Sequence, residues 1–171
     1  PVSGSAEDIL SKAQRLKNVV DAVNVTDGPN ANVHMSSLAS SAILKANSIE
    51  PIAQFTCRDR NRIALYSDLL GLSALDVNNI LILNGDDPTA GDQPEARPVF
   101  DLKSHELIHV AHMMTNECII PSKRPKANYP SNKPNTKSLT SPTRFFIGAA
   151  DVPTADFSRE WVESIRKKHE S

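Results

Sequence analysis

Several features are scarce or absent in this chain of 171 residues. Charge of one sign does not dominate, because 19 lysine and arginine side chains oppose 20 carboxylates and give a net charge of −1. Such a chain has no overall field to attract nucleic acid or an anionic membrane surface. Its apolar runs fall well short of the roughly 20 residues of a membrane-spanning helix. We therefore expect neither nucleic acid nor membrane among its partners.

Cysteine is nearly absent as well. Cys57 and Cys118 have no metal-type spacing, and they fit a reducing compartment better than a disulfide-stabilised scaffold. No secretory signal is visible, although the chain begins at Pro1 without a methionine. These features predict a cytoplasmic protein, and 171 residues suit one domain. They leave open whether it forms a homo-oligomer.

Strand and helix patterns alternate along the chain. Strand character marks 22–25, 51–59, 78–88 and 144–151, whereas helical periodicity marks 6–20, 36–46, 60–70, 104–114 and 158–171. The segment 115–143, rich in Pro, Asn, Ser and Lys, predicts a long loop insertion. This order predicts an α/β fold with a parallel sheet, either doubly wound or a (β/α)8 barrel. No G-x-G-x-x-G motif or P-loop follows a strand, so the strongest nucleotide-binding fingerprints are excluded.

Each predicted strand ends in polar residues that include an aspartate: Asp27, Asp59, Asp86 and Asp151. In parallel α/β folds the active site lies at these carboxyl ends. Asp59 and Asp151 are explained equally well as helix caps. A long loop follows Asp86, so capping does not explain that residue. Its neighbour Asp87 is predicted to be solvated and without a role.

Four segments resemble one known family. NVTDGPNANVHMSS, FTCRDRNRIALYSDLLG, LILNGDDP and PVFDLKS are similar to motifs of the methylenetetrahydrofolate reductase family, in the same order. The resemblance implies a TIM barrel, of which this single domain would cover strands two to five, about half. It also implies FAD at the strand ends, NADH or NADPH as reductant, and 5,10-methylenetetrahydrofolate as the substrate reduced to 5-methyltetrahydrofolate. The acidic residue on the family's first strand has no counterpart here, so we expect no folate turnover from 1–171 alone.

The resemblance implies particular site residues. Asp86, with Asn84 and Gly85, matches the motif beside flavin and folate, and it is the predicted catalytic and substrate-binding residue. An anion there would stabilise cationic character that develops at the methylene carbon. The other implied flavin contacts are Thr26, Gln54, Thr56, Gly148, Ala149, Ala150, Lys167 and Lys168. Gln54 replaces a histidine of the family, and Asn84 stands where arginine is common.

Some signals have two interpretations. Three histidines at helical spacing could bind a metal, but they lie opposite an apolar helix face and are better explained as solvated: His105, His109 and His112. We therefore predict no metal site. Gly148–Ala150 could instead serve close packing of the barrel. Arg58 could face a phosphate or pair with the following helix start, and the basic segment 122–137 is better read as a solvated insertion than as a nucleic-acid loop.

Three functions remain after these comparisons of motifs. The first is flavin-dependent reduction of methylenetetrahydrofolate. The second is a catalytically inactive binding or interaction subunit of the same fold, favoured by the departures at Gln54 and Asn84. The third is a folate-dependent methyltransferase barrel without flavin. Flavin colour in the purified protein would separate the first from the others.

Overall fold

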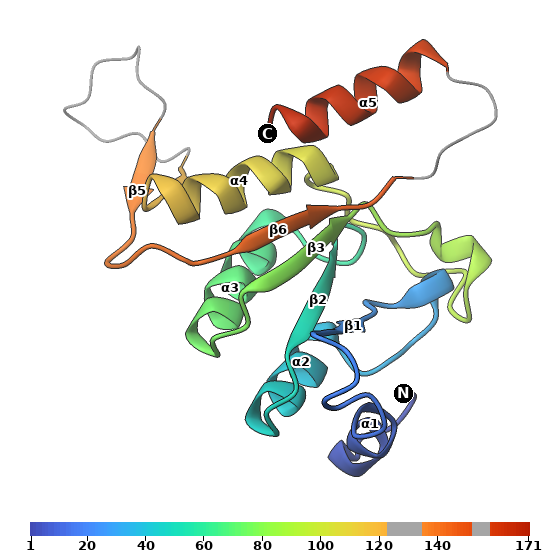
Figure 1. Ribbon diagram of the computed structural model, residues 1–171. Helices are drawn as coiled ribbons and strands as arrows, with labels where there is room; N and C mark the ends of the chain where they lie inside the picture. Colours follow the sequence, from blue (N-terminus) through green and yellow to red (C-terminus); the bar gives the residue numbers. More distant parts are fainter. Residues whose placement is uncertain (123–134, 152–157) are drawn as a thin grey trace.

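A computed structural model of the chain describes residues 1–122, 135–151 and 158–171 (Figure 1). Four parallel strands form the main sheet in the order β1-β2-β3-β6. They are β1 (Val23–Val25), β2 (Pro51–Thr56), β3 (Asn79–Leu83) and β6 (Phe146–Ala149). The helices are α1 (Ala6–Ala13), α2 (Ser37–Ala46), α3 (Arg62–Ala74), α4 (Ser104–Asn116) and α5 (Arg159–His169), with short 3-10 turns η1 (Pro29–Ala31) and η2 (Pro88–Ala90). The predicted α/β fold with a parallel sheet is confirmed, whereas barrel closure stays a prediction.

Helices cover one face of this sheet. Phe55 of β2 and Ile82 of β3 are buried in a core with leucines of α3 and with Leu107 and Met114 of α4. A smaller core joins α1 and α2 to β1. Burial alternates along β2 and β3, because successive strand residues point to opposite faces. The core therefore lies on the helix-covered side.

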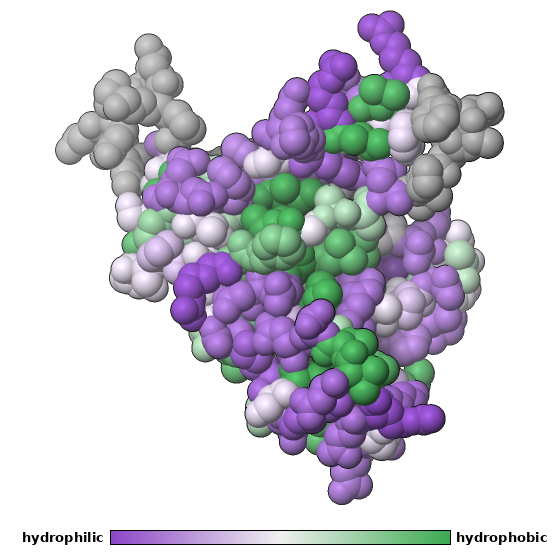
Figure 2. All heavy atoms as spheres, viewed as in Figure 1, coloured by the Kyte–Doolittle hydropathy of each residue, from purple (hydrophilic) through white to green (hydrophobic). Residues whose placement is uncertain are grey.

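The other face of the sheet is less covered. Gln54 and Leu81, which point away from the core, are only half-buried, and Phe146 is 76% exposed. Figure 2 shows a hydrophobic area over β3 and β6. In Figure 1 the arrowheads of β2, β3 and β6 point to the same edge of the sheet. Polar residues that follow these strands are thereby brought together.

Two sequence predictions about the elements are corrected. The helix predicted over 6–20 ends at Ala13, and the chain continues in turns in which Asn18 adopts a positive φ of 64°. The segment 115–143 is not a simple loop, because β4 (Ile119–Pro121) and β5 (Thr136–Ser138) pair in antiparallel fashion there. The segment has the composition of a loop, rich in Pro, Asn, Ser and Lys, and this hides two strands of only three residues each. Residues 123–134 of that segment lie outside the described part.

Within the described residues, no helix is both long enough and apolar enough to cross a membrane.

Candidate functional site

A cavity of about 490 Å³ opens where the strands end. We call it the strand-end cavity. Predicted site residues that line it are Thr26, Gln54, Thr56, Asn84, Gly85, Asp86, Ala150 and Lys168, together with Asp27, Pro29, Asn30, Leu83, Ser104 and Asp151. Segments that follow β1, β2, β3 and β6 all contribute, as expected for a parallel sheet. Gly148, Ala149 and Lys167 are not among the lining residues.

Strand register explains the positions of the small residues of β6. Gln54, Leu81 and Gly148 are partners across β2, β3 and β6, so they share the less covered face. Ala149 instead pairs with Ile82, a core residue, and its side chain belongs to the helix-covered side. A Cβ at Gly148 would lie 3.1 Å from Leu81 Cδ1, which indicates close packing within the sheet.

Asp86 lies at the rim of the strand-end cavity with its carboxylate held by the main chain. Its Oδ2 accepts a hydrogen bond of 2.9 Å from the backbone N–H of Asn30. Asn30 belongs to η1, which follows β1, two strands away from β3 in the sheet. The carboxylate is therefore exposed to a ligand yet fixed in direction.

Asp87 has a local role that the sequence did not show. Its carboxylate caps η2 and accepts hydrogen bonds from Thr89 N at 2.9 Å and Thr89 Oγ1 at 2.7 Å. The backbone hydrogen bond, followed by the hydroxyl hydrogen bond, lowers the pKa of Asp87. The two adjacent acids thus differ in what they do: Asp87 stabilises a turn, and Asp86 faces the cavity.

Asn84 and Gly85 shape the end of β3. Asn84 Oδ1 accepts a hydrogen bond of 2.8 Å from Ser104 N at the start of α4, which leaves its NH₂ as the group to offer a ligand. Gly85 has a φ of 95°, and an added Cβ would lie 2.9 Å from Arg58 Cβ.

Gly85→Ala is expected to destabilise the protein by about 1–3 kcal/mol, because this backbone conformation is strained for any residue with a Cβ. Urea unfolding followed by circular dichroism measures the change. Gly4→Ala is the control, since a Cβ there meets nothing within 4 Å. Equal effects of the two variants would contradict the assignment of strain to Gly85.

Thr56 forms part of the cavity wall, but its hydroxyl is not available to a ligand. Its N–H and Oγ1 both donate to Asp27 Oδ2, at 2.9 and 3.0 Å, and the residue is 2% exposed. Arg60 pairs with the same carboxylate. Asp27 therefore ties the end of β1 to the end of β2. Sequence reasoning noticed it only as one of four strand-end aspartates.

The two lysines of the basic pair on α5 lie in different places. Lys168 Nζ donates to Ala150 O and to Asp151 Oδ2, both at 2.8 Å, and so brings a cation to the strand-end cavity. Lys167 is exposed and lies away from the cavity. The capping alternative for Asp151 is wrong, because Ser158 caps α5. It is wrong for Asp59 as well: Asn61 caps α3, and Asp59 pairs with Arg58.

Two alternative chemistries find no support in the described part of the chain. No group of three or more potential metal ligands occurs there, and His109 and His112 lie on the exposed side of α4. Cys57 is fully buried, and burial raises the pKa of its thiol to about 12. A thiol kept protonated is a poor nucleophile.

The buried thiol gives a pH prediction. Unfolding exposes Cys57 to water, where its pKa falls toward 9.0, so the unfolded chain loses this proton first as pH rises. The stability it contributes is complete below pH 9.0 and is lost progressively toward pH 12. Between pH 8 and pH 10 we expect the free energy of unfolding to fall by about 1 kcal/mol more in wild type than in Cys57→Ala. Urea melts at both pH values measure this, and equal falls would refute it.

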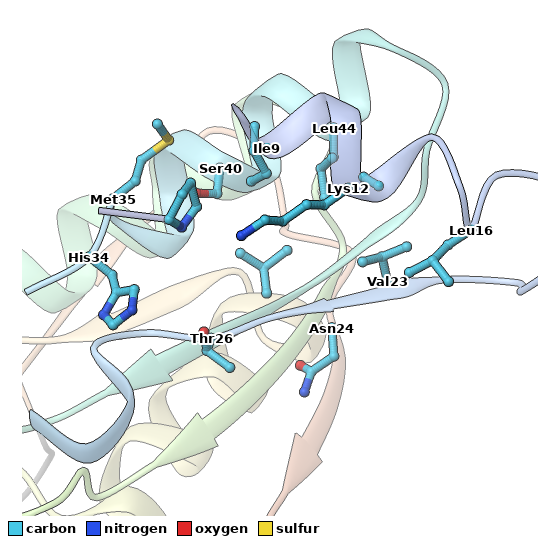
Figure 3. Close-up of a pocket in the computed structure, with 13 residues that line it drawn as sticks. Ile9, Lys12, Leu16, Val23, Asn24, Thr26, His34, Met35, Ser40 and Leu44 are labelled. Carbon is cyan, nitrogen blue, oxygen red and sulfur yellow. The ribbon is translucent and has the colours of Figure 1, made fainter. Parts of the chain in front are cut away.

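A second cavity, of about 180 Å³, lies along the edge of β1 between α1 and α2 (Figure 3). Its walls are mainly apolar, from residues such as Ile9, Leu16 and Leu44. The Lys12 amine extends into it in Figure 3. Thr26 lines both this cavity and the strand-end cavity, so its position at the end of β1 is shared between them.

A parallel sheet whose strand ends converge on a polar-rimmed cavity is the arrangement in which α/β proteins commonly bind ligands. Comparison with known proteins narrows the class. The family model for methylenetetrahydrofolate reductase matches residues 2–153, so the chain belongs to the methylenetetrahydrofolate reductase family. No curated protein matches the chain significantly. Lys167 and Lys168 lie beyond the matched residues.

Proposed function

We propose that this protein reduces 5,10-methylenetetrahydrofolate to 5-methyltetrahydrofolate, with FAD as cofactor and NADH or NADPH as the reductant. Family membership supports a folate-related reduction. One observation carries the proposal further: the strand-end cavity gathers residues from four strand ends that the family motifs assign to cofactor and substrate.

The residues of the cavity suit a flavin. Gln54 and the NH₂ of Asn84 offer amide donors, and Lys168 offers a cation. Leu83 gives the cavity an apolar wall for an aromatic ring system. FAD supplies hydride transfer, while the protein supplies binding, orientation and charge around the ring. These side chains are the ones that would hold it.

Asp86 is the residue we assign to the reacting centre. Its carboxylate would stabilise positive charge that develops on the one-carbon unit of the folate. The fixed hydrogen bond from Asn30 N orients this anion before substrate arrives, so little reorganisation is needed. Thr26, which lines the cavity at the end of β1, would help to hold the flavin and the nicotinamide.

FAD binding and turnover test the proposal. We expect the purified full-length protein to bind FAD, with a flavin absorption spectrum, and to oxidise NADH or NADPH when methylenetetrahydrofolate is added. Residues 1–171 alone are expected to bind FAD weakly and not to turn over. Folate binding without any FAD binding would instead support a flavin-free methyltransferase and would overturn the proposal.

A second function is favoured by the less covered face of the sheet. Phe146 is 76% exposed there, and a large apolar side chain on an open sheet face suits contact with another protein surface. A binding or interaction subunit of this fold would therefore bind folate or a partner without NADH or NADPH oxidation. The turnover assay separates this alternative from the reductase.

A further inference from the structure

Arg58 is a charged residue in an unusual position. It is the second residue after β2 and is only 4% exposed. From the sequence, it could face a phosphate or pair with a helix start. Its guanidinium forms a two-pronged pair with Asp59, from Nε at 2.7 Å and from Nη2 at 2.8 Å.

The third contact of Arg58 is with the main chain of another loop. Nη1 donates to the carbonyl oxygen of Gly28 at 3.2 Å. A Cβ on Gly28 would lie 2.4 Å from Arg58 Nη2, so a side chain there would displace the guanidinium from the turn. On its other side the stem of Arg58 packs against Gly85, just before Asp86. Arg58 thus lies between the loop after β1 and the loop after β3.

The turn that Arg58 supports is conformationally costly. Gly28, Asn30 and Ala31 have φ values of 56°, 53° and 55°. For residues other than glycine this left-handed region costs roughly 1–2 kcal/mol each. Such a turn persists only where surrounding contacts hold it. The Asn30 N–H that orients Asp86 is part of this turn.

Charge supports the same arrangement. The pKa of the Arg58 guanidinium is raised, mainly by its hydrogen bonds to Asp59 and further by the charges of Asp59, Asp27 and Asp86. Arg58 is therefore a permanent cation.

We propose that Arg58 is a positioning residue for Asp86, which acts by holding the Gly28–Ala31 turn so that Asn30 N–H stays directed at the Asp86 carboxylate. The effect of Arg58 on catalysis rests on the proposed function. The contacts that link Arg58 through the turn to Asp86 do not depend on it. The linkage joins three loops, after β1, β2 and β3, through one buried side chain.

A second set of contacts joins the loop after β1 to the loop after β3 and serves as an internal reference for hydrogen exchange. Asp92 accepts hydrogen bonds from Val33 N at 3.1 Å to each carboxylate oxygen, and Gly91 packs against the Ala31 carbonyl. Neither contact involves Arg58. Loss of Arg58 should therefore loosen Asn30 while Val33 N–H stays protected.

Amide hydrogen exchange measured by NMR tests the linkage without catalysis. In Asp86→Ala, which removes the acceptor, and in Arg58→Met, which removes the support of the turn, exchange at Asn30 N–H should accelerate about tenfold or more. The double variant should add little to either, as expected for coupled residues. Val33 N–H should change little. Arg62→Met is the matched control, since Arg62 forms an equivalent pair with Asp101 at 2.7 and 2.8 Å.

Two further variants keep the test decisive if Arg58→Met fails to fold. Gly28→Ala disturbs the same contact from the other side, and Arg58→Lys keeps the charge but not the forked geometry. Either should reproduce the faster Asn30 exchange. If Asn30 exchanges equally in wild type, Arg58→Met, Arg58→Lys and Gly28→Ala, or if Val33 and Asn30 accelerate together, the inference is overturned.

The effect of the same variants on turnover is measured in a separate experiment. In the full-length protein, Arg58→Met should lower kcat for folate reduction about tenfold with KM little changed, because a misdirected Asp86 weakens transition-state rather than ground-state interactions. Arg58→Lys should recover part of that loss. If Asp86→Asn leaves turnover intact while Asn30 exchange still responds to Arg58, the proposed function fails and the linkage stands. If Arg58→Met leaves kcat at the wild-type value while Asp86→Asn lowers it, the positioning role is wrong.

Discussion

Asp86→Asn is expected to lower kcat/KM for methylenetetrahydrofolate reduction by about a hundredfold or more, the size of effect seen when one preorganised electrostatic group is removed. Asparagine keeps the shape and can still accept from Asn30 N–H, but it lacks the negative charge. Steady-state assays with NADH or NADPH in the full-length protein give the measurement. The loss should appear mainly in kcat, because the charge acts on the transition state.

Asp87→Asn provides the matched control for this experiment. The neighbouring acid caps η2 through Thr89, and asparagine is also a good capping residue. Turnover by Asp87→Asn should therefore remain within about threefold of wild type, as for surface changes in general. Equal losses in the two variants would show that the end of β3 has been assigned wrongly.

Phe55→Ala should destabilise the protein by about 3–5 kcal/mol, because it leaves a cavity in the closely packed side of the sheet. Phe55 is fully buried, and the Arg60 guanidinium lies 4.2 Å from the centre of its ring. A loss of this size is a large part of the roughly 5–15 kcal/mol that stabilises an ordinary domain. Urea unfolding with linear extrapolation measures it.

Phe146→Ala tests the opposite face with the same substitution. Phe146 is 76% exposed on β6, so in residues 1–171 alone its loss should change the free energy of unfolding by less than about 0.5 kcal/mol. A large destabilisation by Phe146→Ala would mean that the less covered face is part of a core in the protein as it exists in solution.

The local sequence pattern was enough to predict the α/β order and the edge of the sheet at which the strand-end cavity lies. Four strands and their following helices were recognisable because apolar runs and helical periodicity alternate. The polar residues that end those strands converge for a geometric reason, since parallel strands have their carboxyl ends at one edge. Asp86, Asn84 and Gln54 therefore came together as predicted.

Contacts between distant loops could not be predicted in the same way. The pairing of Asn30 N–H with Asp86 depends on a left-handed turn that no periodicity reveals. The family resemblance grouped Ala149 with Gly148, yet strand alternation places the side chain of Ala149 on the other face. Arg58 looked available for a ligand because charge is visible in sequence, whereas burial is not.

The hydrogen bond that holds Asp86 comes from a peptide group and not from a side chain. Evolution can therefore exchange the side chain at position 30 without touching that donor. The constraint falls on the backbone conformation, which asparagine and glycine tolerate and β-branched residues do not. An alignment of relatives would then show glycine, asparagine and aspartate exchanging freely at position 30. Such variation would mark a position at which the backbone conformation is required although the residue type varies.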